Sequence, residues 1–145
     1  MIVYLDASAL VKRYVAEAGS AEVALLIAQA GAVGTAILSR AEVAAALAKA
    51  VRMKVLPRAG ALAALQVFSA EWEDLVRLQM TEVLVARAAA LAWEHGLRGY
   101  DAAHLASAMF WQDMLGEQVT VATYDRQLWA AARAAGLAAW PDLVA

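Results

Sequence analysis

The sequence predicts an α/β protein in which helices cover both faces of a sheet of about five parallel strands. Short apolar runs rich in β-branched residues alternate with longer segments of helical periodicity along all 145 residues, and glycine or proline marks most boundaries between them. Strands that alternate with helices are joined by crossover connections, which give a parallel sheet between layers of helices. The chain contains no linker or internal repeat, so we expect a single domain over residues 1–145.

The expected strands are short and apolar, as strands in the middle of a parallel sheet are. The clearest is 119–123, in which four of the five residues are valine or threonine. The first, 2–5, ends directly before an acidic residue. In chain order the expected strands are 2–5, 33–38, 74–78, 119–123 and 137–140.

The expected helices begin and end at residues with known preferences. Pro57 suits a first helical turn, Thr81 suits an N-cap, and Gly96 suits a helix end. Ser39 and Glu42 have the spacing of a capping box, in which both side chains bind the first backbone N–H groups. In chain order the expected helices are 7–17, 20–30, 39–53, 57–73, 81–95, 99–115 and 125–135.

The composition excludes several classes of protein. Because the chain has no cysteine, disulfide frameworks, cysteine zinc sites and thiol catalysis are excluded. The first residues lack the basic segment of a signal peptide, and no apolar run approaches the ~20 residues of a membrane span. We therefore expect a cytoplasmic protein without a membrane partner. The formal net charge of −2 is uninformative about nucleic acid, because acidic metal ligands would themselves contribute negative charge.

Four of the 14 acidic residues occupy related places in the predicted fold. Asp6 and Asp125 each follow a strand, and Glu42 lies one turn into the helix after the second strand. The carboxyl ends of parallel strands share one edge of the sheet, and ligands bind there. Asp101 joins this group only if its helix begins near the same edge. The sequence therefore predicts a carboxylate cluster of Asp6, Glu42, Asp101 and Asp125.

A cluster of carboxylates has a specific chemistry, although each acid could instead be a helix cap. Converging carboxylates repel one another unless cations bind between them or some are protonated. An oxygen-only ligand set favours Mg²⁺ or Mn²⁺ over zinc, and such ions assist the hydrolysis of phosphate esters. The phosphate loop, the dinucleotide fingerprint and the serine-nucleophile elbow are all absent from the sequence. A phosphotransfer receiver would need a second aspartate where Ser8 stands.

Other polar residues lie near these acids in the sequence. Ser8 and Thr123 are placed to hydrogen-bond a water or a phosphate oxygen, or to cap a helix, and His104 could either contact the site or pack in the core. The candidate phosphate ligands, which could equally be solvated or ion-paired, are Arg40, Arg98 and Arg126. A separate basic group, which we interpret as a solvated connection between helices, consists of Lys49, Arg52, Lys54 and Arg58.

The candidate acids lie in four segments, which in chain order are Tyr4–Lys12, Leu38–Val43, Arg98–Ala106 and Thr123–Leu128. These segments resemble motifs of the PIN-domain family, in particular the VapC-like ribonuclease toxins of type II toxin–antitoxin systems. The third, with Tyr100 and Asp101, is the most specific. The four motifs occur in the matching order and span nearly the whole chain.

The resemblance implies a Rossmann-like α/β/α sandwich with sheet order 3-2-1-4-5, Mg²⁺- or Mn²⁺-dependent cleavage of RNA, a homodimer, and inhibition by a cognate antitoxin. It makes Asp6 and Asp101 the principal metal ligands, completed by Glu42 and Asp125. It gives Ser8 and Thr123 supporting roles. We therefore predict a metal-dependent endoribonuclease. The alternative is a non-catalytic module with the PIN fold that binds RNA or a protein.

Overall fold

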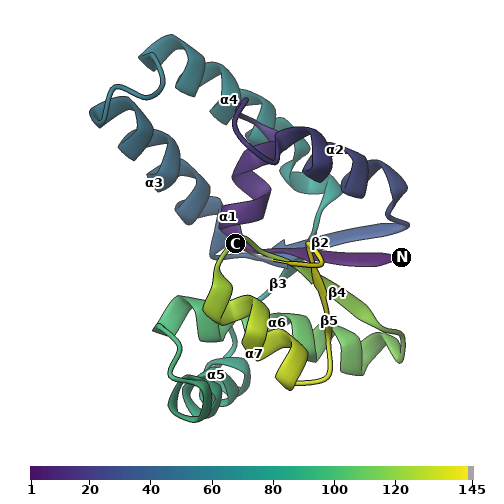
Figure 1. Cartoon of the computed structure of the whole chain (residues 1–145). Coiled ribbons are helices and arrows are strands. Elements are labelled where there is room, and N and C mark those ends of the chain that lie inside the picture. The colour runs from purple at the N-terminus through teal and green to yellow at the C-terminus, as the bar shows by residue number, and fades with distance from the viewer. Residues whose placement is uncertain (144–145) are drawn as a thin grey trace.

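A computed structural model describes residues 1–143 and contains one sheet of five parallel strands. The strand order is β3-β2-β1-β4-β5 (Figure 1). This order confirms the predicted 3-2-1-4-5 sheet, with the first strand at its centre. The strands are β1 (Ile2–Leu5), β2 (Ala32–Ala36), β3 (Val76–Leu78), β4 (Val119–Ala122) and β5 (Ala138–Trp140).

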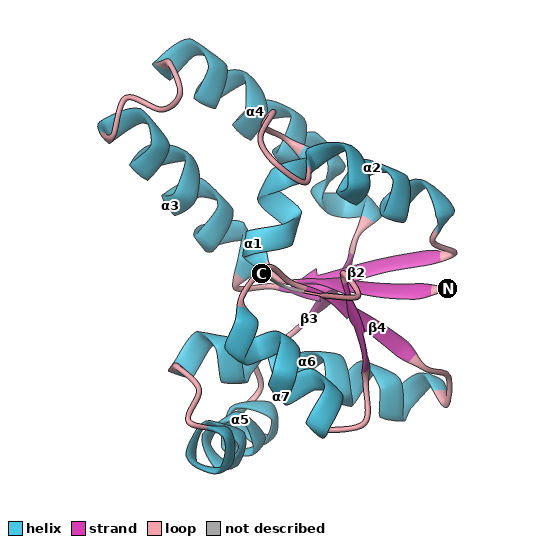
Figure 2. Ribbon diagram, viewed as in Figure 1, coloured by secondary structure: helices cyan, strands magenta, loops and turns pink. Residues whose placement is uncertain are grey.

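Helices cover both faces of this sheet (Figure 2). Helices α1 to α4 lie on one side, and α5, α6 and α7 lie on the other (Figure 1). In the described part of the chain, no helix combines the length and apolarity needed to cross a bilayer. The helices are α1 (Ala7–Leu10), α2 (Ser20–Gln29), α3 (Ser39–Arg52), α4 (Arg58–Glu71), α5 (Glu82–His95), α6 (Gly99–Leu115) and α7 (Arg126–Ala134), with short 3₁₀ helices η1 (Val11–Arg13) and η2 (Trp72–Asp74).

The alternation of side chains along β1 creates two hydrophobic cores. Val3 and Leu5 pack with α1 to α4, whereas Tyr4 points to the opposite face and packs with α5, α6 and α7. All three side chains are completely buried. A central parallel strand is covered on both faces, which explains why this segment reads as a continuous apolar run.

Gly34 in β2 allows α6 to lie close to the sheet. A Cβ atom at this position would stand 2.7 Å from the ring of Trp111, a buried residue of α6. A side chain at position 34 would therefore push the helix away. The close contact matters for the site because the first turns of α6 carry Asp101 and His104.

Three local predictions differ from the structure. The helix expected over 7–17 is cut short, because Ser20 Oγ bonds both the Val15 carbonyl and the Glu17 N–H and holds the chain in a turn. Strand β2 ends before Leu38, which already has helical dihedral angles. The capping box is wrong: the α3 N-terminus has no side-chain cap, and Ser39 Oγ lies 2.6 Å from Thr35 Oγ1.

Candidate active site

The four acids named from the sequence line one pocket at the carboxyl edge of the sheet. Strand β1 lies between β2 and β4 there, at the point where the chain changes direction across the sheet. Asp101 joins the group because α6 begins at this edge. The pocket has a volume of about 130 Å³. Its lining residues are Asp6, Ala7, Ser8, Glu42, Arg98, Tyr100, Asp101, His104 and Asp125.

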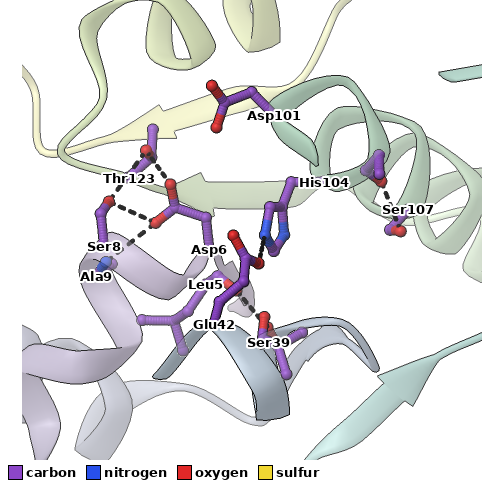
Figure 3. A network of polar contacts seen from close by, with 12 residues as sticks. Leu5, Asp6, Ser8, Ala9, Ser39, Glu42, Asp101, His104, Ser107 and Thr123 are labelled. Atoms are coloured by element: carbon purple, nitrogen blue, oxygen red, sulfur yellow. Dashed lines mark hydrogen bonds and ion pairs between the residues drawn. The ribbon is translucent and has the colours of Figure 1, made fainter. Parts of the chain in front are cut away.

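Asp6 is held by hydrogen bonds on both carboxylate oxygens (Figure 3). Oδ1 accepts from Ser8 Oγ at 2.7 Å and from the Ala9 N–H at 3.0 Å, and Oδ2 accepts from Thr123 Oγ1 at 2.6 Å. The Asp6 side chain is almost completely buried, with an exposed fraction of 2%. This burial raises the pKa of its carboxyl group, whereas the nearby His104 and the hydrogen bonds from Thr123 and Ser8 lower the pKa. The carboxylate is therefore both the N-cap of α1 and a fixed wall of the pocket.

Arg98 connects two further carboxylates. Its Nε donates to Asp101 Oδ2 at 2.9 Å, and its Nη2 donates to Asp125 Oδ2 at 3.1 Å. Burial raises the pKa of the Asp101 carboxyl, the hydrogen bond from Arg98 lowers it, and the nearby Asp125 raises it further. Asp125 Oδ1 also accepts from the Leu128 N–H and caps α7. As with Asp6, one oxygen of Asp125 caps a helix while the other accepts from a side chain of another segment.

Glu42 is reached by a chain of polar contacts that starts in the core and ends with the contact of His104 with Glu42, which Figure 3 shows. Tyr4 Oη lies 2.6 Å from His104 Nδ1, and His104 Nε2 lies 2.6 Å from Glu42 Oε1. Burial raises the pKa of the Tyr4 hydroxyl well above its ordinary value, so this group stays protonated beside Nδ1. Because a carboxylate oxygen only accepts hydrogen bonds, His104 Nε2 is the donor to Glu42.

Sequence reasoning missed Tyr4 and left the role of His104 open. Two signals were available. Tyr4 lies in β1, and Asp6, two residues later, directly follows this strand with an extended backbone, so the two side chains point to the same side. Asp101 and His104 are three residues apart on α6, so they lie on the same face of the helix. The first spacing places Tyr4 on the same side as Asp6, and the second places His104 on the same side as Asp101.

The supporting residues and the arginines have different surroundings. Ser8 and Thr123 both donate to Asp6, and Thr123 Oγ1 also accepts from the Asp125 N–H at 3.0 Å. Of the three arginines, only Arg98 lines the pocket. The Arg40 guanidinium lies 5.9 Å from the centre of the Trp72 ring. Arg126, like Arg40, is absent from the pocket lining.

The donor set of the pocket fits a hard divalent cation. Four carboxylates supply oxygen ligands of the kind that Mg²⁺ and Mn²⁺ prefer, and a nearby cation would favour the ionised form of the buried Asp6 and Asp101. However, within residues 1–143 no three acidic or histidine side chains are gathered closely enough to hold an ion as they stand. Each of the four carboxylates is instead hydrogen-bonded to a donor of the protein.

An acidic pocket at the direction change of a parallel sheet defines an α/β protein of the Rossmann-like class. The chain belongs to the PIN-domain family, because the family model described as PIN domain matches residues 3–135. Two curated relatives from Mycobacterium tuberculosis, named Ribonuclease VapC45 (strain CDC 1551 / Oshkosh) and Ribonuclease VapC49 (strain ATCC 25618 / H37Rv), are each 37% identical over 135 residues. Each match covers 93% of this chain and 92% of the relative.

Solved structures share the fold. PAE2754 from Pyrobaculum aerophilum has a TM-score of 0.66 and 23% identity, and the match covers 96% of this chain and 83% of that chain. A chain from a toxin–antitoxin complex of Klebsiella pneumoniae has a TM-score of 0.63 and 15% identity, and the match covers 88% and 90% of the two chains. At these identities the likeness concerns the fold alone.

Proposed function

We propose that this chain is a divalent-metal-dependent endoribonuclease and the toxin of a type II toxin–antitoxin pair. The observation that carries the proposal is the convergence of four carboxylates, from four separate segments of the chain, on one small pocket. The curated relatives named ribonucleases, which match 93% of the chain, support the nuclease activity.

The four carboxylates would hold Mg²⁺ or Mn²⁺, with Asp6 and Asp101 as the principal ligands. A bound ion would neutralise phosphate charge, lower the pKa of a water molecule and stabilise the leaving oxygen. The protein itself fixes the ligands: Thr123 and Ser8 hold Asp6 by hydrogen bonds, and His104 holds Glu42. Such outer contacts orient metal ligands and raise their affinity.

Arg98 is the residue that we assign to the RNA phosphate. Its side chain is 60% exposed at the edge of the pocket, and a guanidinium group can donate two parallel hydrogen bonds to a phosphate. Arg40 and Arg126, which lie outside the pocket lining, remain predicted contacts to the more distant RNA backbone. Phosphate contacts of this kind position a strand without reading its sequence.

The expected protein partners are a cognate antitoxin and a second copy of the chain. The likeness to a chain in a toxin–antitoxin complex and the VapC names of the relatives support the antitoxin. Copurification of the antitoxin from cells that express both genes, with loss of ribonuclease activity in the complex, tests the first partner. Light scattering of the purified chain during gel filtration tests the homodimer.

Cleavage of labelled RNA by the purified chain, with Mn²⁺ or Mg²⁺ and with excess chelator, tests the enzyme. We expect cleavage that needs the ion and leaves 5′-phosphate and 3′-hydroxyl ends, because water attacks phosphorus and the bond to the 3′ oxygen breaks. Products with 2′,3′-cyclic phosphate ends would contradict this mechanism, since the ribose hydroxyl would then be the attacking group.

The second candidate function is a non-catalytic module that binds RNA or a protein. The hydrogen bonds that every site carboxylate makes to protein donors favour it, because a structural network of this kind needs no ion. Tight RNA binding by the wild-type chain without cleavage in Mn²⁺ would support this candidate over the enzyme.

A further inference from the structure

Helices α3 and α4 pack as a hairpin that extends away from the sheet (Figure 1). Residues 43–70 of this hairpin contain four basic and no acidic residues, although the formal net charge of the whole chain is −2. All four are exposed, and none forms an ion pair within residues 1–143. We call this surface the basic tip; it consists of Lys49, Arg52, Lys54 and Arg58.

Helix stability explains only half of the basic tip. Lys49 and Arg52 lie in the last turn of α3, where positive charge interacts favourably with the helix dipole. Arg58 is the first residue of α4, where the dipole disfavours positive charge. The charge of Arg58 is therefore placed against the local preference of its helix.

Lys54 is also placed against its local preference. Its φ of 57° lies in the left-handed region, which side chains with a Cβ atom rarely adopt. Every other residue with such a positive φ within residues 1–143 is a glycine, including Gly96 and Gly116 at the ends of α5 and α6. A lysine thus stands at a position where a glycine would be less strained.

The basic tip is continuous with the acidic pocket along α3. Glu42, in the pocket, and Lys49 are two turns apart on the same face of the helix, a rise of about 10 Å. Arg52 follows one turn later. Only the small, exposed side chains of Ala45 and Ala46 lie between Glu42 and Lys49 on this side of the helix. An extended chain could thus run from the pocket to the tip along this surface.

We propose that the basic tip binds the phosphate backbone of a single-stranded RNA segment that continues from the pocket along α3. This inference rests on the proposed function and adds a second contact to the substrate. Exposed lysine and arginine side chains bind phosphates of any sequence, so the tip contributes affinity and direction of the strand. The tip therefore favours RNA that is long enough to reach it.

Binding of fluorescein-labelled oligouridine, followed by anisotropy in EDTA over a range of salt concentrations, tests the proposal without cleavage. RNA of roughly 16 nucleotides reaches the tip. The short RNA is the dinucleotide UpU, whose single phosphate occupies the pocket and leaves no phosphate for the tip. On the long RNA, we expect Arg52→Gln, Lys54→Gly and Arg58→Gln each to reduce the slope of log K against log salt by about 0.7, the value of one lost phosphate contact. Binding of the short RNA stays unchanged.

Lys54→Gly also separates binding from folding. Because glycine relieves the strain at this position, the variant should melt roughly 2–4 °C higher than the wild type. Stability and RNA affinity then change in opposite directions, which a structural role for Lys54 would not produce. The matched control is Arg133→Gln, which removes an exposed cation from α7 in the other helical layer.

Two results would overturn the proposal: salt slopes that stay the same in all three tip variants, or slopes that Arg133→Gln reduces equally. Unchanged slopes would leave an acidic protein as the alternative partner of the tip. The proposed enzyme activity is tested separately by cleavage in Mn²⁺. If the wild-type chain cleaves the short RNA but the tip variants keep the wild-type salt slope, only this inference is disproved. If the tip variants reduce the salt slope but the wild-type chain cleaves no RNA, only the proposed enzyme activity is disproved.

Discussion

The acidic pocket and the basic tip lie at opposite ends of helix α3. At the pocket, Asp6 and Asp101 are 2% and 5% exposed, and each is hydrogen-bonded to neighbouring side chains. At the tip, Lys49 and Arg52 are exposed and make no ion pair within residues 1–143. Buried, hydrogen-bonded groups depend on exact geometry, whereas exposed charges act through a field that salt screens over ~10 Å. Under the two proposals, the pocket would therefore control the chemistry and the tip the affinity for RNA.

The largest expected effect is the loss of a pocket carboxylate. Asp101→Asn should reduce cleavage more than roughly 100-fold, because removing even an outer contact of a metal ligand costs 10–100-fold. Asp113→Asn is a matched control on the same helix, since Asp113 is exposed and pairs with Arg87 at the surface. Cleavage rates in Mn²⁺ measure both. Equal rates for the two variants would contradict the assignment of the pocket.

The next effect concerns the chain of contacts behind Glu42. His104→Gln should weaken Mn²⁺ binding roughly 10–100-fold, because Glu42 loses the donor that orients it. Tyr4→Phe should act in the same direction with a smaller effect, since it leaves His104 in place. Electron paramagnetic resonance of free Mn²⁺ measures the affinity apart from activity. Unchanged affinity in both variants, as expected for the control His95→Gln, would make His104 a core residue only.

Metal binding should also stabilise the fold. At a free Mn²⁺ concentration about ten times the dissociation constant, the free energy of unfolding should rise by about 1.4 kcal/mol, and EDTA should reverse the change. Denaturant unfolding with and without the ion measures the difference. The increase should disappear in Asp101→Asn. A similar increase in that variant would show that the ion binds elsewhere.

The smallest effect is expected from one charge at the tip end of α3. Lys49→Gln should leave cleavage of the short RNA unchanged and reduce the salt slope for the long RNA by about 0.7. Glu42→Gln, two turns away on the same face, should instead abolish cleavage of both RNAs. If Lys49→Gln slowed cleavage of the short RNA as strongly as Glu42→Gln, the division between pocket and tip would be wrong.

The sequence alone determined the order and type of the elements. Apolar runs and helical periodicity identified the five strands and the principal helices, because both patterns depend on residues close together in the chain. The resemblance to the PIN-domain family supplied the strand order, which the structure confirms. The alternation of strands and helices, without the resemblance, placed Asp6, Glu42 and Asp125 at one edge, since parallel strands all end on the same side.

Only the tertiary structure decided which side chains meet. The contact of Tyr4 with His104 joins residues 100 positions apart, and that of His104 with Glu42 joins residues 62 positions apart. The capping box failed for the same reason, because Thr35 and His104 offered Ser39 and Glu42 partners from outside the helix. Local preferences are worth about 1 kcal/mol, so packing of α6 against the sheet can override them. The pairing of Arg98 with Asp125 likewise required α6 and α7 to begin side by side.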